Sequence, residues 1–367
     1  MAPSYQLIWG LLVAGIFNLC LSASRAEFLA AYQYHSAAII SWKRSSRAIS
    51  YITGWINVCG WVALSATGPL LGSTFVININ LFHPAYITQP WHQPLICIAF
   101  ALIALAINAF LTRLLPYTKA AFFWSVAGFV IIVVTVLACA LPNFQTGKFV
   151  YGQLINNGAF ALTGFDATAH VIEEIPEPRR QEPKTMLYCI GIGIFTGFIF
   201  LSGLLFCINN IDDVINASWG PLLQIFIDAT KSKAGSTCLV IFPLLCMVFT
   251  TVTLVCTSTR MSYAFARDRG MPSSRFFARV HPTHDVPLNA LFWTVGWVMV
   301  FGCIFLGSSR TFNAITSASV VALGVTYAIP PGINVVRGRA MLLPGIAFKV
   351  GVLWTISTTI LQYKGLF

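Results

Sequence analysis

Long apolar runs separated by short polar breaks fill almost the whole chain. Residues 48–112 contain no Asp, Glu, Lys or Arg, and this run is too long for one membrane crossing, which takes about 20 residues. His and Pro residues between positions 83 and 94 divide the run into two passages. The same division along the rest of the chain predicts a single transmembrane domain with these helical passages: residues 7–24, 52–79, 95–112, 120–141, 149–172, 186–208, 236–258, 287–307, 311–335 and 342–361.

The composition supports an all-α polytopic protein embedded in the lipid bilayer. Of the 367 residues, 57% are hydrophobic and only 9% are charged, whereas a soluble domain has about 25% charged residues. The formal net charge of +11 does not indicate nucleic-acid binding, because the basic residues form short clusters between the apolar runs.

The distribution of Lys and Arg predicts the orientation in the membrane. Sixteen of them fall in the breaks after the odd-numbered passages, and five fall on the opposite side. Cytoplasmic loops carry the excess of Lys and Arg, so the first side is predicted to be cytoplasmic. Asn216 begins a glycosylation sequon on the opposite side, where we expect it to be outside the cell. We expect a multi-pass protein of the plasma membrane.

The fifth passage, residues 149–172, is interrupted by Gly158, Gly164 and a charge, Asp166. A carboxylate within the bilayer costs roughly 2.5–3.5 kcal/mol on insertion scales. A Gly-interrupted apolar segment indicates the broken helix of a secondary transporter, although a glycine kink for close helix packing is the alternative. In a broken helix, free carbonyls would face a substrate amine, and Asp166 would cap the next half-helix or contact the substrate. The predicted substrate-binding residues are Phe160, Ala161, Leu162, Thr163, Gly164, Phe165 and Asp166.

A charged segment with several prolines follows the broken passage. Pro176, Pro178 and Pro183 predict a loop that lasts until the sixth passage. The charges could form a cytoplasmic gate whose ion pairs exist in one state and separate in another, or they could simply be solvated. Arg267, on a later basic loop, could pair with this segment or meet anionic lipid head groups. The predicted gating residues are Glu173, Glu174, Arg179, Arg180 and Arg267.

The chain has no Walker loop, no HExxH metal motif, no nucleophile elbow and no CxxC pair. We therefore expect no enzyme activity, no cofactor and no metal site. The sequence also has no nucleotide-binding domain, so it does not encode a primary pump by itself.

Two motifs place these features in a known context. The first is Thr163-Gly164-Phe165-Asp166-Ala167, followed by Glu173-Glu174-Ile175-Pro176 and Pro178-Arg179-Arg180. The second runs from Thr259 through Arg267-Asp268 to Gly270-Met271-Pro272. Shorter matches are Gly54-Trp55-Ile56-Asn57 and Tyr327-Ala328-Ile329-Pro330. With these motifs the chain resembles the amino acid–polyamine–organocation superfamily, and most closely its fungal amino acid/choline permease branch.

The resemblance implies a LeuT-like fold of two inverted five-helix repeats, each opening with a broken helix. Substrate would lie between the two broken helices, and Gly164 and Phe165 with the preceding backbone would form half of that site. The expected function is secondary transport of amino acids or related amines such as GABA or choline, coupled to a proton or another cation.

The sequence departs from the family in one respect. Only four passages precede the interrupted one, so the first broken helix is expected to be missing, together with the last helix. The alternative to a working permease is therefore a membrane sensor that does not transport, or an inactive remnant of a permease.

Overall fold

Every regular element in the part of the chain that the computed structural model describes is a helix. The described residues are 6–31, 46–80, 86–111, 119–141, 144–151, 178–282, 286–304 and 310–336. The helices are α1 (Gln6–Ala31), α3 (Ser46–Asn80), α4 (His92–Phe110), α5 (Lys119–Ala140), α6 (Gly147–Tyr151), α7 (Pro178–Phe206), α8 (Ile211–Asn216), α9 (Pro221–Thr230), α10 (Lys233–Arg267), α11 (Ser274–Phe277), α12 (Leu288–Ile304) and α13 (Arg310–Val336).

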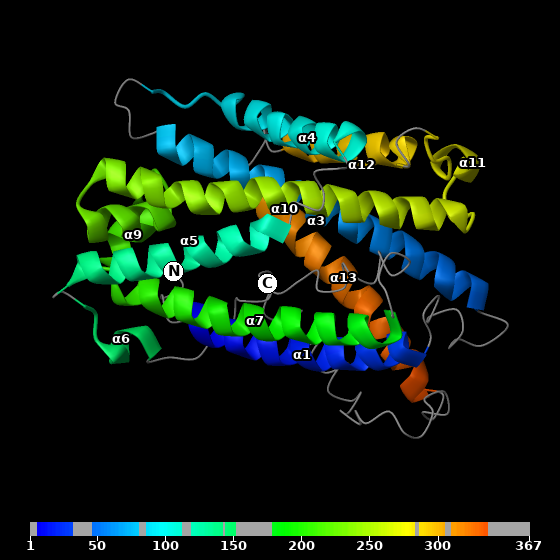
Figure 1. Ribbon diagram of the computed structural model, residues 1–367, viewed down its shortest axis with the longest axis horizontal. Coiled ribbons are helices and arrows are strands. Elements are labelled where there is room, and N and C mark those ends of the chain that lie inside the picture. Colours follow the sequence, from blue (N-terminus) through cyan, green and yellow to red (C-terminus); the bar gives the residue numbers. More distant parts are fainter. Residues whose placement is uncertain are drawn as a thin grey trace.

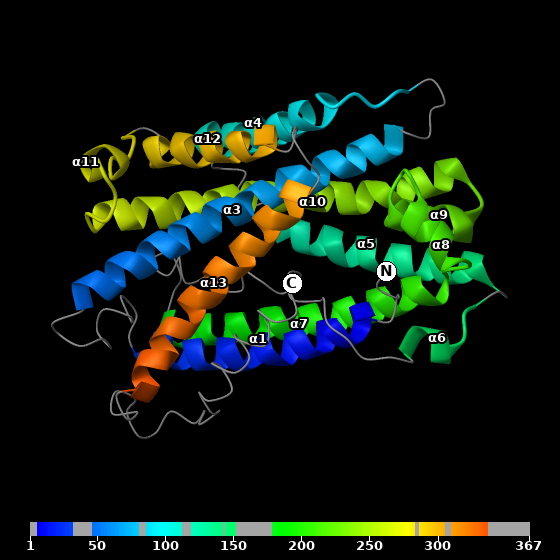
Figure 2. The same cartoon turned by 180° about the vertical axis from the view of Figure 1, so that it is seen from behind.

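Helix α3 is the centre of the bundle, and it packs against α10, α13, α4 and α12. Helices α1 and α7 lie side by side as a second layer, and α13 crosses obliquely from α3 to α1 (Figures 1 and 2). Short helices occupy the two ends: α8 and α9 lie at one end, and α11 lies at the other (Figure 1).

Glycine allows α3 to approach its neighbours closely. A Cβ on Gly68 would lie 3.3 Å from the backbone Cα of Thr251 in α10, and one on Gly60 would lie 3.0 Å from the Leu323 side chain in α13. Contacts between backbones do not relax by a rotamer change, so a larger residue at Gly68 would push the two helices apart. Small residues at helix contacts are typical of membrane bundles, where close packing replaces the hydrophobic driving force.

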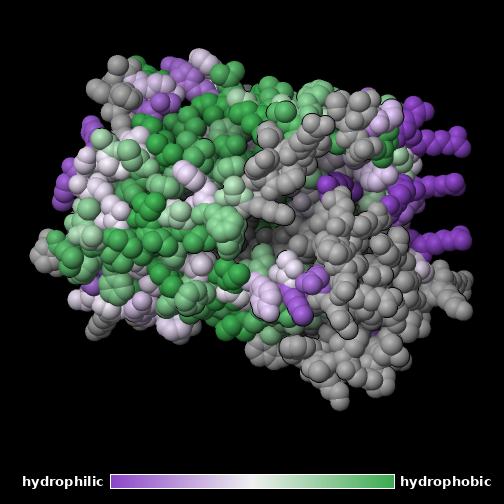
Figure 3. Space-filling model, viewed as in Figure 1, coloured by the Kyte–Doolittle hydropathy of each residue, from purple (hydrophilic) through white to green (hydrophobic). Residues whose placement is uncertain are grey.

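The outer surface of the bundle is apolar, as expected for a protein in a bilayer. Six helices among the described residues are long and apolar enough to cross a membrane, and α12 is a shorter apolar helix. Large apolar side chains face outward; Phe123 on α5, for example, is 73% exposed. Figure 3 shows a broad hydrophobic surface with hydrophilic side chains gathered at the ends of the molecule. The chain is therefore an integral membrane protein with several passages.

Helices cover most of the ranges that the hydrophobic pattern predicts. α3 ends at Asn80 and α4 begins at His92, so the expected break in the long uncharged run lies between two separate helices. The limits of each membrane-crossing part stay predictions. The fifth passage is described only as far as Tyr151, and the tenth lies outside the described residues.

The loop predicted for residues 178–184 is wrong, because α7 begins at Pro178 and runs without a break to Phe206. Pro178 is the first helical residue, where the missing N–H has no helical partner to lose. Pro183 lies in the second turn and removes one hydrogen bond, to the carbonyl of Arg179. Proline therefore marks the start of this helix rather than a loop.

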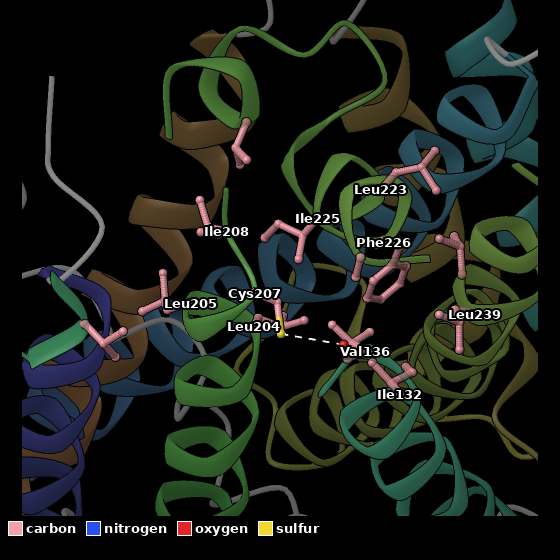
Figure 4. Close-up of a cluster of buried hydrophobic side chains, with 14 of the residues drawn as sticks. Ile132, Val136, Leu204, Leu205, Cys207, Ile208, Leu223, Ile225, Phe226 and Leu239 are labelled. Atoms are coloured by element: carbon pink, nitrogen blue, oxygen red, sulfur yellow. Dashed lines mark hydrogen bonds between the residues drawn. The ribbon is translucent and has the colours of Figure 1, made fainter. Parts of the chain in front are cut away.

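An apolar cluster fastens α9 to the ends of α5, α7 and α10. Phe226 points from α9 toward Ile132 and Val136 of α5, and Leu223 and Ile225 of α9 belong to the same cluster (Figure 4). The Cys207 thiol reaches the Val136 carbonyl at 3.7 Å in the same cluster (Figure 4). The amphipathic α9 thereby buries its apolar face at this end of the bundle. Gly220, before α9, has φ of 84°, a left-handed conformation that favours glycine.

Candidate functional site

The residues predicted to bind substrate, Phe160 to Asp166, lie outside the described residues, and so do Glu173 and Glu174. Arg179 and Arg180 are in the first turn of α7, and Arg267 is the last residue of α10. Asn216 ends α8 at the α9 end of the molecule, where its side-chain amide donates to the Asp212 carbonyl at 2.9 Å. Its glycosylation stays a prediction.

Five helices meet in one buried cluster. Trp61 of α3 packs there with Leu21 of α1, Met186 of α7 and Tyr327 of α13, and Met261 of α10 lies against them. Arg25 of α1 places its guanidinium 4.7 Å from the centre of the Tyr327 ring, a cation–π distance. The cluster therefore joins the central layer to the α1–α7 layer.

Several buried polar groups lie within about two helical turns of this cluster. Asn57, one turn before Trp61 on α3, donates its side-chain amide to the Met261 sulfur at 3.7 Å. Its carbonyl oxygen Oδ1 is buried and has no hydrogen-bond partner among the described residues. Leaving such a group unpaired costs roughly 1–3 kcal/mol, so a protein keeps it only where something compensates.

The hydroxyl groups of α10 fall into two classes. Thr251 and Thr259 are buried and donate to carbonyls of their own helix, each at 2.7 Å. Ser258 and Ser262 are also buried, but within the described residues their Oγ atoms have no partner. A serine in a helix usually bonds to the carbonyl four residues earlier, so these two hydroxyls are available to another group.

Helices α1 and α13 add further unpaired groups. Asn18 Nδ2 and Ser22 Oγ on α1 are buried without a partner in the described chain, and the same holds for both polar side-chain atoms of Asn334 on α13. Pro330 and Pro331 lie inside α13, and proline cannot donate to the carbonyl four residues earlier. Unpaired amides, hydroxyls and helix carbonyls are the groups that can hold a small polar molecule inside a bundle.

An aromatic ring fills the contact between α3 and α10 near α11. Phe265 of α10 lies against Gly54 of α3 and Gly270 beyond α10, and a Cβ on either glycine would overlap its ring. Trp55 meets Phe265 edge to face, with ring centroids 5.6 Å apart. Phe265 thus occupies a slot that requires glycine at both position 54 and position 270.

The end of α10 is fixed by a Schellman motif. The Gly270 N–H donates to the Phe265 carbonyl at 2.9 Å, and the Arg269 N–H donates to the Ala266 carbonyl at 2.9 Å. Arg269 has φ of 61°, the left-handed residue of this motif. Arg267 Nε lies 3.8 Å from the carboxylate of Asp268, and both side chains are partly exposed. The predicted pairing of Arg267 with residues 173–182 stays a prediction.

The structure brings together motifs that lie far apart in the sequence. The match at residues 54–57 meets the match that begins at Thr259, and Tyr327 of the third match joins the same cluster. Asn57 and Ser262 belong to these motifs, but nothing in the sequence marks either of them as a site residue. Ser258 and Asn334 carried no distinguishing signal, because an unpaired hydroxyl or amide is visible only once the neighbours are placed.

Comparison with known proteins gives consistent relatives. A protein of Macrophomina phaseolina named as an amino acid/polyamine transporter is 33% identical over 353 residues, which cover 88% of this chain and 76% of that protein. The choline transporter of Saccharomyces cerevisiae is 27% identical over 355 residues, or 89% of this chain and 62% of the transporter. A homologue of an amino-acid permease in Oryza sativa subsp. japonica is 28% identical over 406 residues, which cover 97% of this chain and 77% of that protein.

The chain thus spans 62–77% of the length of these three relatives. All three are described as permeases or transporters, not as enzymes. The model of the amino acid permease family matches residues 2–340, which is nearly the whole chain. The chain belongs to the amino acid permease family, within the amino acid–polyamine–organocation superfamily.

Proposed function

We propose that this protein is a secondary permease for amino acids or related amines, such as GABA or choline, in the plasma membrane. The observation that carries the proposal is the family match over residues 2–340. Relatives of the chain are named as transporters of amino acids or polyamines and of choline, which gives the proposed substrate class. The proposed driving force is a proton gradient, as the resemblance to secondary transporters of this superfamily implies.

The substrate would lie between residues 160–166 and the polar faces of α3 and α10. Free carbonyls of the interrupted segment would accept hydrogen bonds from an ammonium group, and Asn57 Oδ1 and the hydroxyls of Ser258 and Ser262 would meet the rest of the molecule. A bound solute would supply the partners that these groups lack in the described chain. The cost of burying them would then be offset in the loaded state.

Two devices would control access from the cytoplasmic side. Phe265 closes the α3–α10 contact, and it is flanked by the two glycines that make its slot. Glu173, Glu174, Arg179, Arg180 and Arg267 would form ion pairs that differ between open and closed states. Such pairs at a partly exposed end are individually weak, which suits contacts that must break in each cycle.

Uptake of a panel of radiolabelled amino acids, GABA, choline and polyamines tests the proposal in cells that lack their own transporters. We expect uptake of at least one member, abolished by Gly164→Leu and reduced about tenfold or more by Ser262→Ala, since a lost hydrogen bond of 1.4 kcal/mol is a factor of ten. Thr259→Val is the matched control, because Thr259 is buried on the same helix but bonds to its own backbone. It should leave uptake near the parent level.

Surface labelling must show equal amounts of each variant at the plasma membrane. An imposed pH gradient should drive accumulation, and a protonophore should abolish it. Specific binding of a panel member without any uptake would contradict transport and support the alternative, a sensor that does not transport. Equal losses in Ser262→Ala and Thr259→Val would remove Ser262 from the proposed site.

A further inference from the structure

The short helix α11 is a firmly held element at the end of α10. The Asn289 side-chain amide donates to the Phe276 carbonyl at 2.8 Å, and the His281 N–H donates to the Val286 carbonyl at 3.0 Å. The Ala278 N–H donates to the Ser274 carbonyl at 2.8 Å. The first two bonds tie α11 and the residues after it to the start of α12, which fixes the position of α11 relative to the bundle.

The two phenylalanines of α11 differ in exposure, although their rings meet edge to face with centroids 5.3 Å apart. Phe277 packs inward against Trp293 of α12, with ring centroids 6.2 Å apart. Phe276 is 52% exposed, and Val280 is 44% exposed. Arg275 and Arg279 are exposed beside them. Two arginine–apolar pairs are therefore exposed together, Arg275 and Phe276 in α11 and Arg279 and Val280 just beyond it, and we call these four residues the α11 platform.

Positive charge dominates this end of the molecule. Residues 260–282 contain five arginines and a single acid, Asp268, which already contacts Arg267. In the described residues no ion pair is formed by Arg275 or Arg279. Figure 3 shows hydrophilic side chains projecting from this end, where α11 lies in Figure 1. The opposite end is balanced, because Asp212, Asp213 and Asp228 accompany Lys231 and Lys233.

We propose that the α11 platform binds the head groups of anionic phospholipids in the adjacent leaflet. Arg275 and Arg279 would contact the phosphate and carboxylate groups, and Phe276 and Val280 would enter the boundary between head groups and acyl chains. An exposed aromatic next to arginines matches this boundary, which is apolar on one side and charged on the other. A soluble anion would satisfy the arginines but would not cover Phe276.

The test measures the melting temperature of the purified full chain in neutral detergent after addition of phosphatidylserine or phosphatidylcholine. We expect phosphatidylserine to raise the melting temperature and phosphatidylcholine to raise it much less. The difference should shrink in high salt, because the attraction is electrostatic and partly exposed. The double variant Arg275→Gln/Arg279→Gln should lose the phosphatidylserine effect, and Phe276→Ser should reduce it.

Two controls separate this site from general charge effects. Lys231→Gln/Lys233→Gln removes two exposed cations at the opposite end and should keep the phosphatidylserine effect. Arg275→Lys/Arg279→Lys keeps the charge and should retain most of it, which also shows that substitution there does not prevent folding. Equal stabilisation by both lipids, an unchanged effect in the Gln double variant, or the same shift with glycerophosphoserine alone would overturn the proposal.

Discussion

The two ends of the α10 contact surface are built on different principles. At the α9 end, an apolar cluster fills the space, and the polar side chains of α9 have partners: Trp219 donates to Gln224 at 2.6 Å, and Gln224 donates to Asp228 at 2.8 Å. Toward the α11 end, Phe265 is fitted between two glycines, and Asn57, Ser258 and Ser262 keep buried groups without partners in the described chain.

This difference separates stability from function along one helix. The α9 end, where the polar side chains of α9 already have partners, holds the bundle together and offers no hydrogen-bonding groups of α9 to a solute. An end with unpaired groups is less stable by itself, and its polar groups are available to a ligand. Function is expected where stability has been given up, as at many binding sites. Substitutions at the two ends should therefore have different effects.

Phe226→Ala tests the apolar cluster at the α9 end and should give the largest loss of stability. Phe226 is fully buried in the α9 cluster, and truncating a buried phenylalanine costs about 3–5 kcal/mol through lost burial and a cavity. We expect a clear fall in melting temperature of the purified chain in detergent, measured by its fluorescence or by the fraction that remains monodisperse. A change within experimental error would mean that α9 does not fasten the bundle.

Gly270→Ala tests the glycine slot and should have an intermediate effect. The added Cβ would overlap the Phe265 ring, which also lies against Gly54, and overpacking of this kind costs about 1–3 kcal/mol. Gly296→Ala is the matched control, since nothing lies within 4 Å of a Cβ at this helical position. The control should be neutral or slightly stabilising. Similar melting temperatures for the two variants would show that the slot is not tight.

Asp228→Asn tests the hydrogen-bond network of α9 and should have the smallest effect on stability. Burial raises the pKa of the Asp228 carboxyl, outweighing the hydrogen bond from Gln224 and the charge of Lys231 that lower it; Asp213 raises it further. A carboxyl with a raised folded-state pKa is penalised when ionised, so the parent loses stability as pH rises from about 4 toward 7.

Asparagine cannot ionise, and its side-chain oxygen can still accept from Gln224. The stability of the variant relative to the parent should therefore increase as pH rises across this range. The difference between their melting temperatures at several pH values measures this. Gln224→Ala, which removes the hydrogen bond rather than the charge, should not reproduce that pH dependence. A difference that grows toward acid pH would reverse the sign and contradict the burial argument.

Hydrophobic patterning predicts most of the helices because a bilayer demands long apolar segments, and Pro84 and its neighbours correctly place a break after α3. The start of α7 was predicted wrongly, since Pro178 can begin a helix as well as end one. The motifs at Gly54 and Gly270 were visible in the sequence. Their common partner, Phe265, was not predictable, because it depends on how two distant helices cross.

The site residues also divide into those that the sequence marks and those that only the structure reveals. A buried Ser258 and a buried Thr259 look alike in sequence, and only the placed backbone shows that one hydroxyl is paired and the other is not. The interruption of the passage at residues 149–172 stays a prediction from Gly158, Gly164 and Asp166.

The fit of Phe265 restricts two distant positions of the chain. A Cβ at Gly54 or at Gly270 would overlap the Phe265 ring, so one aromatic side chain limits the residue type at both positions. A larger residue at either position would have to displace the same ring, so the effects of substituting Gly54 and Gly270 are expected to be coupled rather than additive.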